Sequence, residues 1–277
     1  MIEVTGLSKY YGKIRAVENL SFRIEQGSVF GLLGPNGAGK TTTIKMLTTL
    51  SKPDAGHCFI AGYDVVQQPL EVKRLMGVAP QENNLDRELT AYENLVIYSM
   101  LHGVPDRETK IRSCLELVGL WDRRDGLVMQ FSGGMQRRLL IARALLSEPA
   151  VLFLDEPSIG LDPQIRRQMA DIIRKTRIDG RTVVLTTHYI EEAEALCDRV
   201  GILARGSLIA LDTPDNLKAM VGEYIVECVN DEGKLVQEIC KTRDQADRVA
   251  QGLECGITIR RFNLEDVFVK LTGERIE

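Results

Sequence analysis

Short apolar runs alternate with amphipathic stretches along most of this chain. The runs at residues 28–33, 151–154 and 182–186 have the length and composition of buried strands in a parallel sheet. Residues 42–50 and 163–176, which follow the first two runs, carry apolar side chains at helical spacing. This alternation of strand and helix predicts an α/β fold built on an open parallel sheet.

A helical insertion is expected between the first two of these strands. Residues 90–104 and 106–118 carry apolar positions at helical spacing. Thr90 and Glu93 form a capping box at the start of the first segment. We therefore predict two consecutive helices that lie outside the simple strand and helix alternation.

The pattern changes again from residue 213 onward. Strand-like alternation and helical periodicity follow one another, over residues 224–229, 244–253, 257–260 and 264–271. Asn230–Gly233 is typical of a turn between strands. We predict a domain at residues 1–220, with a helical subdomain at about residues 85–148, and a small C-terminal α+β appendix at residues 221–277.

The composition narrows the classes of function. With 35 basic and 39 acidic residues the net charge is -4, and no basic block marks a nucleic-acid footprint, so no nucleic-acid partner is expected. Six cysteines lie far apart without a C-x-x-C pair, which predicts reduced, mostly buried thiols. There is no signal-peptide pattern, and no apolar run approaches the roughly 20 residues that span a bilayer, so we expect a soluble, cytoplasmic chain.

A glycine-rich loop follows the first apolar run. It matches the phosphate-loop (P-loop, Walker A) pattern G-x-x-x-x-G-K-[ST]. In this pattern main-chain N–H groups curl around phosphate oxygens, Lys40 reaches the outer phosphates and the Thr41 hydroxyl ligates Mg²⁺. The helix that follows presents its N-terminus to the anion. The predicted nucleotide-binding residues of this loop are Gly34, Pro35, Asn36, Gly37, Ala38, Gly39, Lys40, Thr41 and Thr42.

Polar side chains also follow the two later strands. Asp155 and Glu156 come directly after residues 151–154, and His188 lies just beyond residues 182–186. The carboxyl ends of parallel strands form the edge at which open α/β sheets bind ligands. We therefore expect Asp155 to hold Mg²⁺ through water, Glu156 to polarise the attacking water and His188 to hydrogen-bond the outermost phosphate.

Two side chains allow two interpretations each. Residues 2–7 and 16–24 predict a small antiparallel β arm, and Tyr11 stands at the turn between them. The Tyr11 ring is suited either to packing or to stacking on a base. Ser132 precedes an amphipathic helix that runs to Leu146; it either simply caps this helix or leaves free N–H groups for an anion.

Taken together, these motifs resemble the ATP-binding subunit of an ABC transporter over about residues 1–220. The resemblance implies a P-loop NTPase core of the RecA-like type that binds ATP with Mg²⁺ and hydrolyses the ATP. It assigns adenine stacking to Tyr11, and to Gln81 a contact with both Mg²⁺ and a membrane partner. The catalytic residues that it implies are Glu156, His188 and Gln81, and the metal-binding residues are Thr41, Gln81 and Asp155.

The same resemblance implies a particular assembly. Two such subunits, identical or paralogous, pack head to tail. The signature loop of one subunit, which is Ser132, Gly133 and Gly134 here, covers the ATP bound by the other. Hydrolysis lets the halves separate and drives a separate integral-membrane permease. The subunit is thus expected at the inner face of the cell membrane, attached peripherally through the permease.

Details of the motifs indicate one branch of the family. The signature loop ends in Met135, where the family has glutamine. Met135, the pair Arg137-Arg138 and the segment Asn263–Gly273 together resemble the ABC-2 type drug and lipid exporters, such as the daunorubicin-resistance ATPases. By itself, the arginine pair is also typical of a solvated helix face. The segment Asn263–Gly273 is likewise typical of an amphipathic helix that packs on the appendix.

Other functions stay open at this level. The chain resembles, in the same motifs, soluble ABC ATPases that act on non-membrane partners and ATPases of importers. Tandem cassettes, a long coiled-coil insertion and basic arms, which most soluble members carry, are not found in the sequence. A nucleotide sensor without turnover is disfavoured by the intact Glu156 and His188. The loop at Ser158-Ile159 departs from the Thr-Thr that is common in the family. The cargo, whether drug, lipid, glycan or ion, is chosen by the permease.

Overall fold

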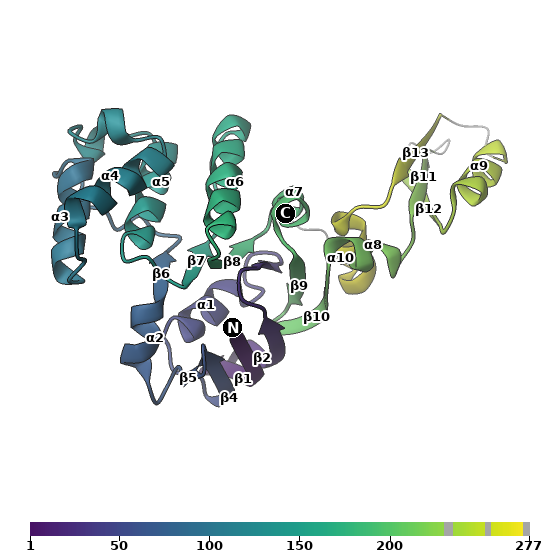
Figure 1. Ribbon diagram of the computed structural model, residues 1–277. Coiled ribbons are helices and arrows are strands. Elements are labelled where there is room, and N and C mark those ends of the chain that lie inside the picture. Colours follow the sequence, from purple (N-terminus) through teal and green to yellow (C-terminus); the bar gives the residue numbers. More distant parts are fainter. Residues whose placement is uncertain (230–234, 253–255, 274–277) are drawn as a thin grey trace.

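The computed structural model describes residues 1–229, 235–252 and 256–273, and its centre is a six-stranded sheet (Figure 1). The strands are β3 (Val29–Leu33), β6 (Met76–Ala79), β7 (Val151–Asp155), β8 (Thr182–Thr187), β9 (Arg199–Ala204) and β10 (Ser207–Asp212). They lie in the order β10-β9-β3-β8-β7-β6, parallel except for β10. The three apolar runs are thus confirmed as strands of one sheet.

Side chains of the central sheet alternate between two hydrophobic cores. On β7, Val151 and Phe153 belong to the core shared with helix α1 (Lys40–Leu47). Leu152 and Leu154 belong to the core on the opposite face, and all four side chains are fully buried. A strand that is covered on both faces needs an uninterrupted apolar run, which explains the pattern at this strand.

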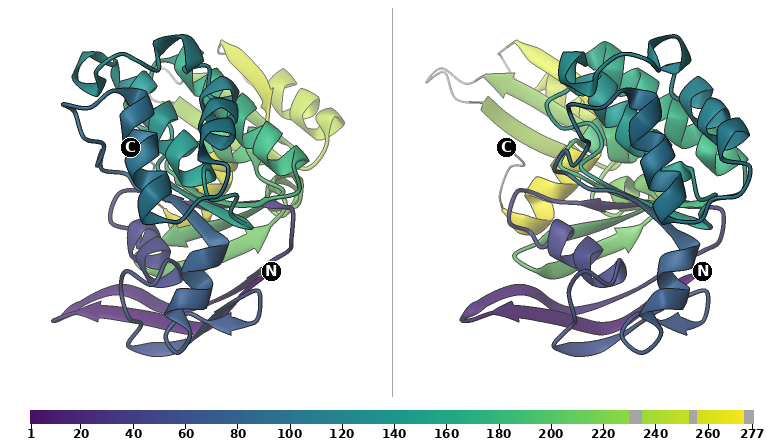
Figure 2. Two further views of the ribbon diagram at one scale, coloured as in Figure 1. Left: turned by 60° about the vertical axis from the view of Figure 1, so that its left-hand side comes forward. Right: turned by 90° about the vertical axis from the view of Figure 1, so that its left-hand side faces the viewer.

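An antiparallel sheet lies on the far side of α1 from the central sheet (Figure 2). Its strands are β1 (Ile2–Tyr11), β2 (Ile14–Ile24), β4 (Ala55–Ile60) and β5 (Tyr63–Asp64), in the order β2-β1-β4-β5. The predicted arm is confirmed as β1 and β2. The pairing of β4 with β1 was not predicted, because only two side chains of β4 are buried and its apolar pattern is weak. Helix α2 (Pro69–Leu75) leads from β5 into β6.

The predicted helical insertion is confirmed as part of a helical layer over the other face of the central sheet (Figure 1). Its helices are α3 (Ala91–Leu101), α4 (Arg107–Leu117) and α5 (Gly133–Leu145), with short 3₁₀ turns η1 (Trp121–Arg123) and η2 (Val128–Gln130). The predicted capping box is present: Glu93 N donates to Thr90 Oγ1 at 3.1 Å, and Thr90 N donates to Glu93 Oε2 at 2.8 Å. Helices α6 (Pro163–Ile178) and α7 (Ile190–Leu196) complete this side of the sheet.

The C-terminal segment forms a separate three-stranded sheet with helices, as an α+β pattern predicts. Its elements are α8 (Pro214–Ala219), β11 (Tyr224–Val229), β12 (Leu235–Cys240), α9 (Arg243–Gln251), β13 (Ile257–Arg261) and α10 (Leu264–Thr272), with the strand order β12-β11-β13. The predicted turn at Asn230–Gly233 and the predicted end of α9 at Leu253 lie outside the described residues. The division at residue 220 stays a prediction.

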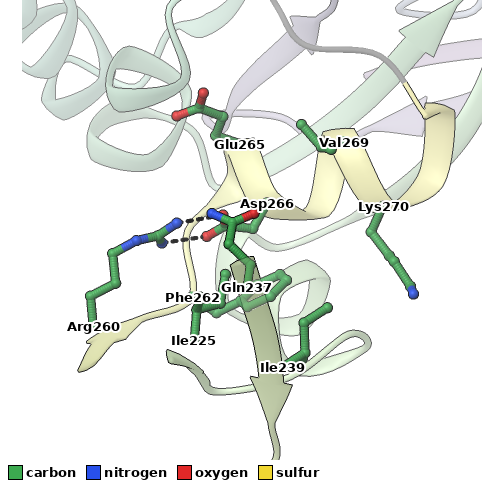
Figure 3. A pocket seen from close by; sticks show the side chains of 9 residues that line it. All are labelled: Ile225, Gln237, Ile239, Arg260, Phe262, Glu265, Asp266, Val269 and Lys270. Atoms are coloured by element: carbon green, nitrogen blue, oxygen red, sulfur yellow. Dashed lines mark hydrogen bonds and ion pairs between the residues drawn. The ribbon is translucent and has the colours of Figure 1, made fainter. Parts of the chain in front are cut away.

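Helix α10 joins the appendix to the main body. Leu264, Val267 and Phe268 are fully buried in the same core as α7. Arg260 on β13 forms a fork with Asp266 on α10, at 2.6 and 2.7 Å, beside a hollow of about 380 Å³ (Figure 3). Arg260 also contacts Glu227 of β11 at 2.8 Å, so its charge has two carboxylate partners.

The cysteines of the described residues are free thiols. Cys58, Cys197, Cys228 and Cys240 are buried and Cys114 is half-buried, which confirms the predicted burial; Cys255 lies outside the described residues. Burial raises the pKa of Cys58 to about 12, so this thiol is unreactive at neutral pH. Among the helices that the structure describes, none has both the length and the apolar character to cross a membrane.

Candidate functional site

The predicted site residues follow adjacent strands of the central sheet. The phosphate loop follows β3, His188 follows β8, Asp155 and Glu156 end β7, and Gln81 follows β6. These four strands are consecutive in the sheet and parallel. Their carboxyl ends therefore share one edge, where open α/β sheets bind ligands.

Two glycines of the phosphate loop, Gly34 and Gly39, are packed so closely that neither leaves room for a side chain. A Cβ at Gly34 would lie 2.3 Å from Leu203 O, and one at Gly39 would lie 2.5 Å from Ala16 O. Gly39 also has a φ of 101°, in the left-handed region that glycine tolerates. Asn36 and Gly37 are exposed at the tip, so the main chain of the loop is open to a ligand.

Lys40 lies across the base of the phosphate loop. Its ammonium donates to Gly34 O at 2.6 Å and to Pro35 O at 3.0 Å, and contacts Glu156 Oε1 at 3.0 Å. The Lys40 and Glu156 side chains are only 5% and 4% exposed. The buried cation is thus held by two carbonyls and one carboxylate.

Oxygen ligands cluster next to Lys40. Thr41 Oγ1 lies 3.2 Å from Asp155 Oδ1, and the Thr186 hydroxyl donates to the same carboxylate oxygen at 2.6 Å. Hydroxyl and carboxylate oxygens are the ligands that Mg²⁺ prefers, so this pair of residues fits a magnesium ion. The Gln81 side chain is exposed on the loop after β6. The sequence did not indicate Thr186, whose hydroxyl orients both acidic residues.

Glu156 is held through its main-chain N–H and carbonyl and through one carboxylate oxygen. Its N–H donates to Thr186 Oγ1 at 2.9 Å, and His188 Nδ1 lies 2.7 Å from Oε2. Its carbonyl accepts from Arg137 Nη2 at 2.9 Å. The residue has a φ of 51°, a left-handed conformation that costs a non-glycine residue roughly 1–2 kcal/mol. Such strain persists where the surroundings hold a residue in place, as at active sites.

Arg137 is a member of this network that the sequence did not reveal. The predicted alternative of a solvated helix face is wrong for Arg137, which is 6% exposed, while Arg138 is half-buried. Arg137 lies three residues after Gly134 and four before Ile141, both of which are buried on α5. A helical projection of α5 would have placed this charge on the buried face.

A hydrogen bond between Ser158 and Glu192 holds the loop that follows Glu156. Ser158 is buried, and its hydroxyl lies 2.5 Å from Glu192 Oε1 of α7. Burial raises the pKa of the Glu192 carboxyl above its ordinary value, and the nearby Glu156 charge adds to this, while hydrogen bonds from Ser158 and Thr187 oppose it. Glu192 was also not predicted, because acidic residues in the first turn of a helix are common.

The Ser132 loop and the phosphate loop of the same chain lie apart. Helix α5 belongs to the core above the central sheet and α1 to the core below it (Figure 1). Ser132 caps α5 by accepting from Met135 N at 3.3 Å, and it is exposed together with Gly133. The predicted cap is therefore confirmed, and the loop is accessible from outside the chain.

The two remaining features lie at the edges of the site. The Tyr11 ring is 48% exposed at the end of β1, with Lys9 Nζ 5.5 Å from its centroid, so it is not a core residue. A cleft of about 820 Å³ separates α2 and β6 from the helical layer. Exposed Leu70 and Leu101 line this cleft, as do Tyr98 and Arg143.

Comparisons with known proteins agree with this geometry. Residues 17–159 match the family model described as ABC transporter. A daunorubicin resistance ATP-binding protein of Streptomyces coeruleorubidus is 37% identical, with 100% of this chain and 96% of that protein covered. A Nod factor export ATP-binding protein I of Burkholderia thailandensis is also 37% identical, with 100% and 98% covered.

Solved structures agree with the predicted fold class. A structure described as the ATP-binding subunit of an ABC transporter is 32% identical with a TM-score of 0.72, and 79% of this chain and 92% of that chain are covered. A dimeric ATP-binding cassette in a post-hydrolysis state, bound to ADP and Pi, is 27% identical with a TM-score of 0.70, and 77% and 98% are covered. The predicted P-loop NTPase fold is confirmed.

Proposed function

The chain belongs to the ABC transporter family, and from this premise we propose that it is the ATP-binding and ATP-hydrolysing subunit of an exporter. It would work with a separate membrane permease of the ABC-2 type. One observation carries the proposal: Lys40, Glu156 and His188 converge on one another at the carboxyl ends of three adjacent parallel strands. This is the arrangement that phosphoryl transfer to water requires.

The phosphate loop would bind the triphosphate. Its main-chain N–H groups and the N-terminus of α1 favour an anion, and Lys40 would exchange its present carbonyl and carboxylate partners for phosphate oxygens. Tyr11 would stack on the adenine, since its ring is half exposed next to a turn.

Magnesium would lie between the loop and β7. Thr41 and Asp155 supply its hydroxyl and carboxylate oxygens, and Gln81 can approach from the loop after β6. When bound, the ion would neutralise charge on the phosphates. Thr186 keeps Asp155 oriented toward Thr41 through its 2.6 Å hydrogen bond.

Glu156 would act as the general base. Its carboxylate would accept a proton from the water that attacks the γ-phosphorus, while the bond from this phosphorus to the ADP oxygen breaks. His188 already contacts Glu156 Oε2 at 2.7 Å and would orient the carboxylate and contact the outermost phosphate. The hydrogen bonds to the Glu156 main chain hold the residue in position for this step.

The Ser132 loop would act on a second subunit. Ser132 and Gly133 are exposed at the N-terminus of α5, a helix of 13 residues, and lie apart from the phosphate loop of their own chain. A head-to-tail dimer would bring this loop, with Gly134, over the ATP of its partner. The dimeric cassette with ADP and Pi among the similar structures supports this assembly.

Export through a permease is supported by the relatives and by one surface. The named relatives are a drug resistance protein and a Nod factor export protein. The cleft beside α2 and α3 exposes apolar side chains such as Leu70 and Leu101 close to the Gln81 loop, which suits a helix of a membrane partner. The subunit would then sit at the inner face of the cell membrane.

Affinity purification tests the proposal. The Glu156→Gln variant, with ATP bound, would be recovered from detergent-solubilised membranes, and co-purifying proteins identified by mass spectrometry. We expect a multi-span membrane protein, and reconstitution with it should restore ATP-dependent export by the wild type. Recovery of ribosomal proteins or a soluble complex without a membrane protein would refute export, and uptake by the reconstituted complex would make it an importer subunit.

A further inference from the structure

We propose that Arg137 is a positioning residue for ATP hydrolysis, which holds the main chain beside Gln81 and Glu156 in one rigid frame. This inference rests on the roles proposed above for Gln81 and Glu156. Arg137 touches neither nucleotide nor metal in this proposal. It would act through the backbone of the two segments that carry those side chains.

The guanidinium group of Arg137 contacts two segments of the main chain. Nη1 donates to Pro80 O and, at 3.2 Å, to Gln81 O. Nη2 donates to Asp155 O and, at 2.9 Å, to Glu156 O. Nε donates to Pro157 O at 3.1 Å. The arginine fork has five N–H groups, and each of them has a carbonyl partner here.

These contacts fall on the two turns that follow β6 and β7. Pro80 and Gln81 come directly after β6, and Asp155 to Pro157 span the end of β7. The strands are neighbours, but beyond their ends the ladder hydrogen bonds stop at Ala79 and Leu154. Arg137 therefore continues the link between the two strands beyond the last residue pair of the ladder.

The link matters most at Glu156. This residue keeps a left-handed φ of 51°, and Arg137 binds its carbonyl while Thr186 binds its N–H. Loss of the guanidinium would free one side of a strained peptide. Misplacement of a catalytic group by about 1 Å can lower the rate about 100-fold, even where substrate binding is kept.

The burial of Arg137 fits a geometric role. All five acceptors are main-chain carbonyls, so the side chain fixes positions and does not neutralise one particular acid. Burial lowers the pKa of Arg137, while the carboxylates of Asp155, Glu156 and Glu192 favour its charged form. Lysine has three donors on a single point and cannot bond all five carbonyls at once.

Arg137 also lies on the helix that Ser132 caps. It follows Ser132 by five positions on α5, so the frame includes the loop proposed to cover the ATP of the second subunit. A shift of α5 on dimer closure would be passed to the turns after β6 and β7 through this one side chain. The guanidinium would thus couple the Ser132 loop of each subunit to its own catalytic carboxylate.

Three variants of the full chain test the proposal. Arg137→Met removes every donor, Arg137→Lys keeps a charge, and Arg138→Met is the matched control. Arg138 is the neighbouring half-buried arginine, and its Nη1 donates to Val118 O at 2.8 Å, within the helical layer. The readouts are kcat, affinity for a non-hydrolysable ATP analogue, and hydrogen–deuterium exchange at residues 80–84 and 155–159.

A positioning role predicts a split between rate and binding. Arg137→Met should lower kcat about 100-fold and Arg137→Lys about 10-fold, with analogue affinity unchanged and faster exchange at both segments. Arg138→Met should change none of these. Equal kcat in Arg137→Lys and the wild type would overturn the proposal, as would loss of kcat in Arg138→Met equal to that in Arg137→Met.

Failure of the proposal can be told from failure of the site assignment. Glu156→Gln, assayed in parallel, should abolish most of the turnover. If it does and the Arg137 variants turn over normally, Arg137 alone is misassigned. If Glu156→Gln turns over normally, the assigned base is wrong. Should Arg137→Met fail to fold, Arg137→Lys and its exchange at residues 80–84 decide the question.

Discussion

Before ATP can bind fully, Lys40 must leave Glu156. The Lys40 ammonium lies 3.0 Å from Glu156 Oε1, and both side chains are buried. The same ammonium is expected to hold phosphate oxygens when ATP is bound. The Glu156→Gln substitution should therefore have two opposite effects, namely slower hydrolysis and tighter ATP binding.

The size of the second effect follows from the burial of the pair. Removal of one partner of a buried ion pair costs about 3–5 kcal/mol, because the remaining charge is left uncompensated. Glutamine keeps an oxygen that can accept from Lys40, so we expect the nucleotide-free variant to lose only about 1–3 kcal/mol of stability. If about 1.4 kcal/mol of that loss is recovered when Lys40 moves to phosphate, the affinity rises about tenfold.

Calorimetric titration with a non-hydrolysable ATP analogue measures this difference. Wild type and Glu156→Gln are compared with Glu116→Gln, which removes the surface partner of Arg112 on α4, a carboxylate whose side chain is 49% exposed. The control should bind the analogue like the wild type, because exposed pairs contribute little. Equal or weaker analogue binding by Glu156→Gln would refute the competition between Glu156 and phosphate for Lys40.

Three further substitutions address other parts of the molecule. Tyr11→Ala should weaken ATP binding by about 1 kcal/mol through lost stacking; an unchanged titration would leave Tyr11 without a role at the base. Phe268→Ala, at a fully buried position of α10, should lower the free energy of unfolding by about 3–5 kcal/mol in denaturant titration. A much smaller loss would show that α10 is not part of the main core. Because the pKa of Glu192 is raised in the folded chain, ionisation of this carboxyl lowers the stability of the fold. This loss of stability appears as the pH rises above the ordinary pKa of 4.5. Glu192→Gln should thus be more stable than wild type at pH 8 and gain less at pH 5, and a gain independent of pH would contradict this.

The sequence alone determined those features whose residues lie close together along the chain. The phosphate loop was predictable because its glycines, Lys40 and Thr41 act within one turn between a strand and a helix. The buried strands were predictable because a strand covered on both faces must be apolar throughout. Capping by Thr90 and Ser132 was predictable because a cap and its partner lie within four residues.

Only the tertiary structure decided which distant groups meet. Arg137 and Pro80 are separated by 57 positions, and no local pattern shows that this helix face covers that turn. The contacts of Thr186 with Asp155 and of Glu192 with Ser158 likewise depend on strand order and on helix packing. Sequence periodicity indicates which face of an element is buried, but the partner of that face is set by the global packing of the chain. For this reason the sequence motifs pointed to Lys40, Glu156 and His188, which contact one another in the structure, but not to the side chains that hold them in place.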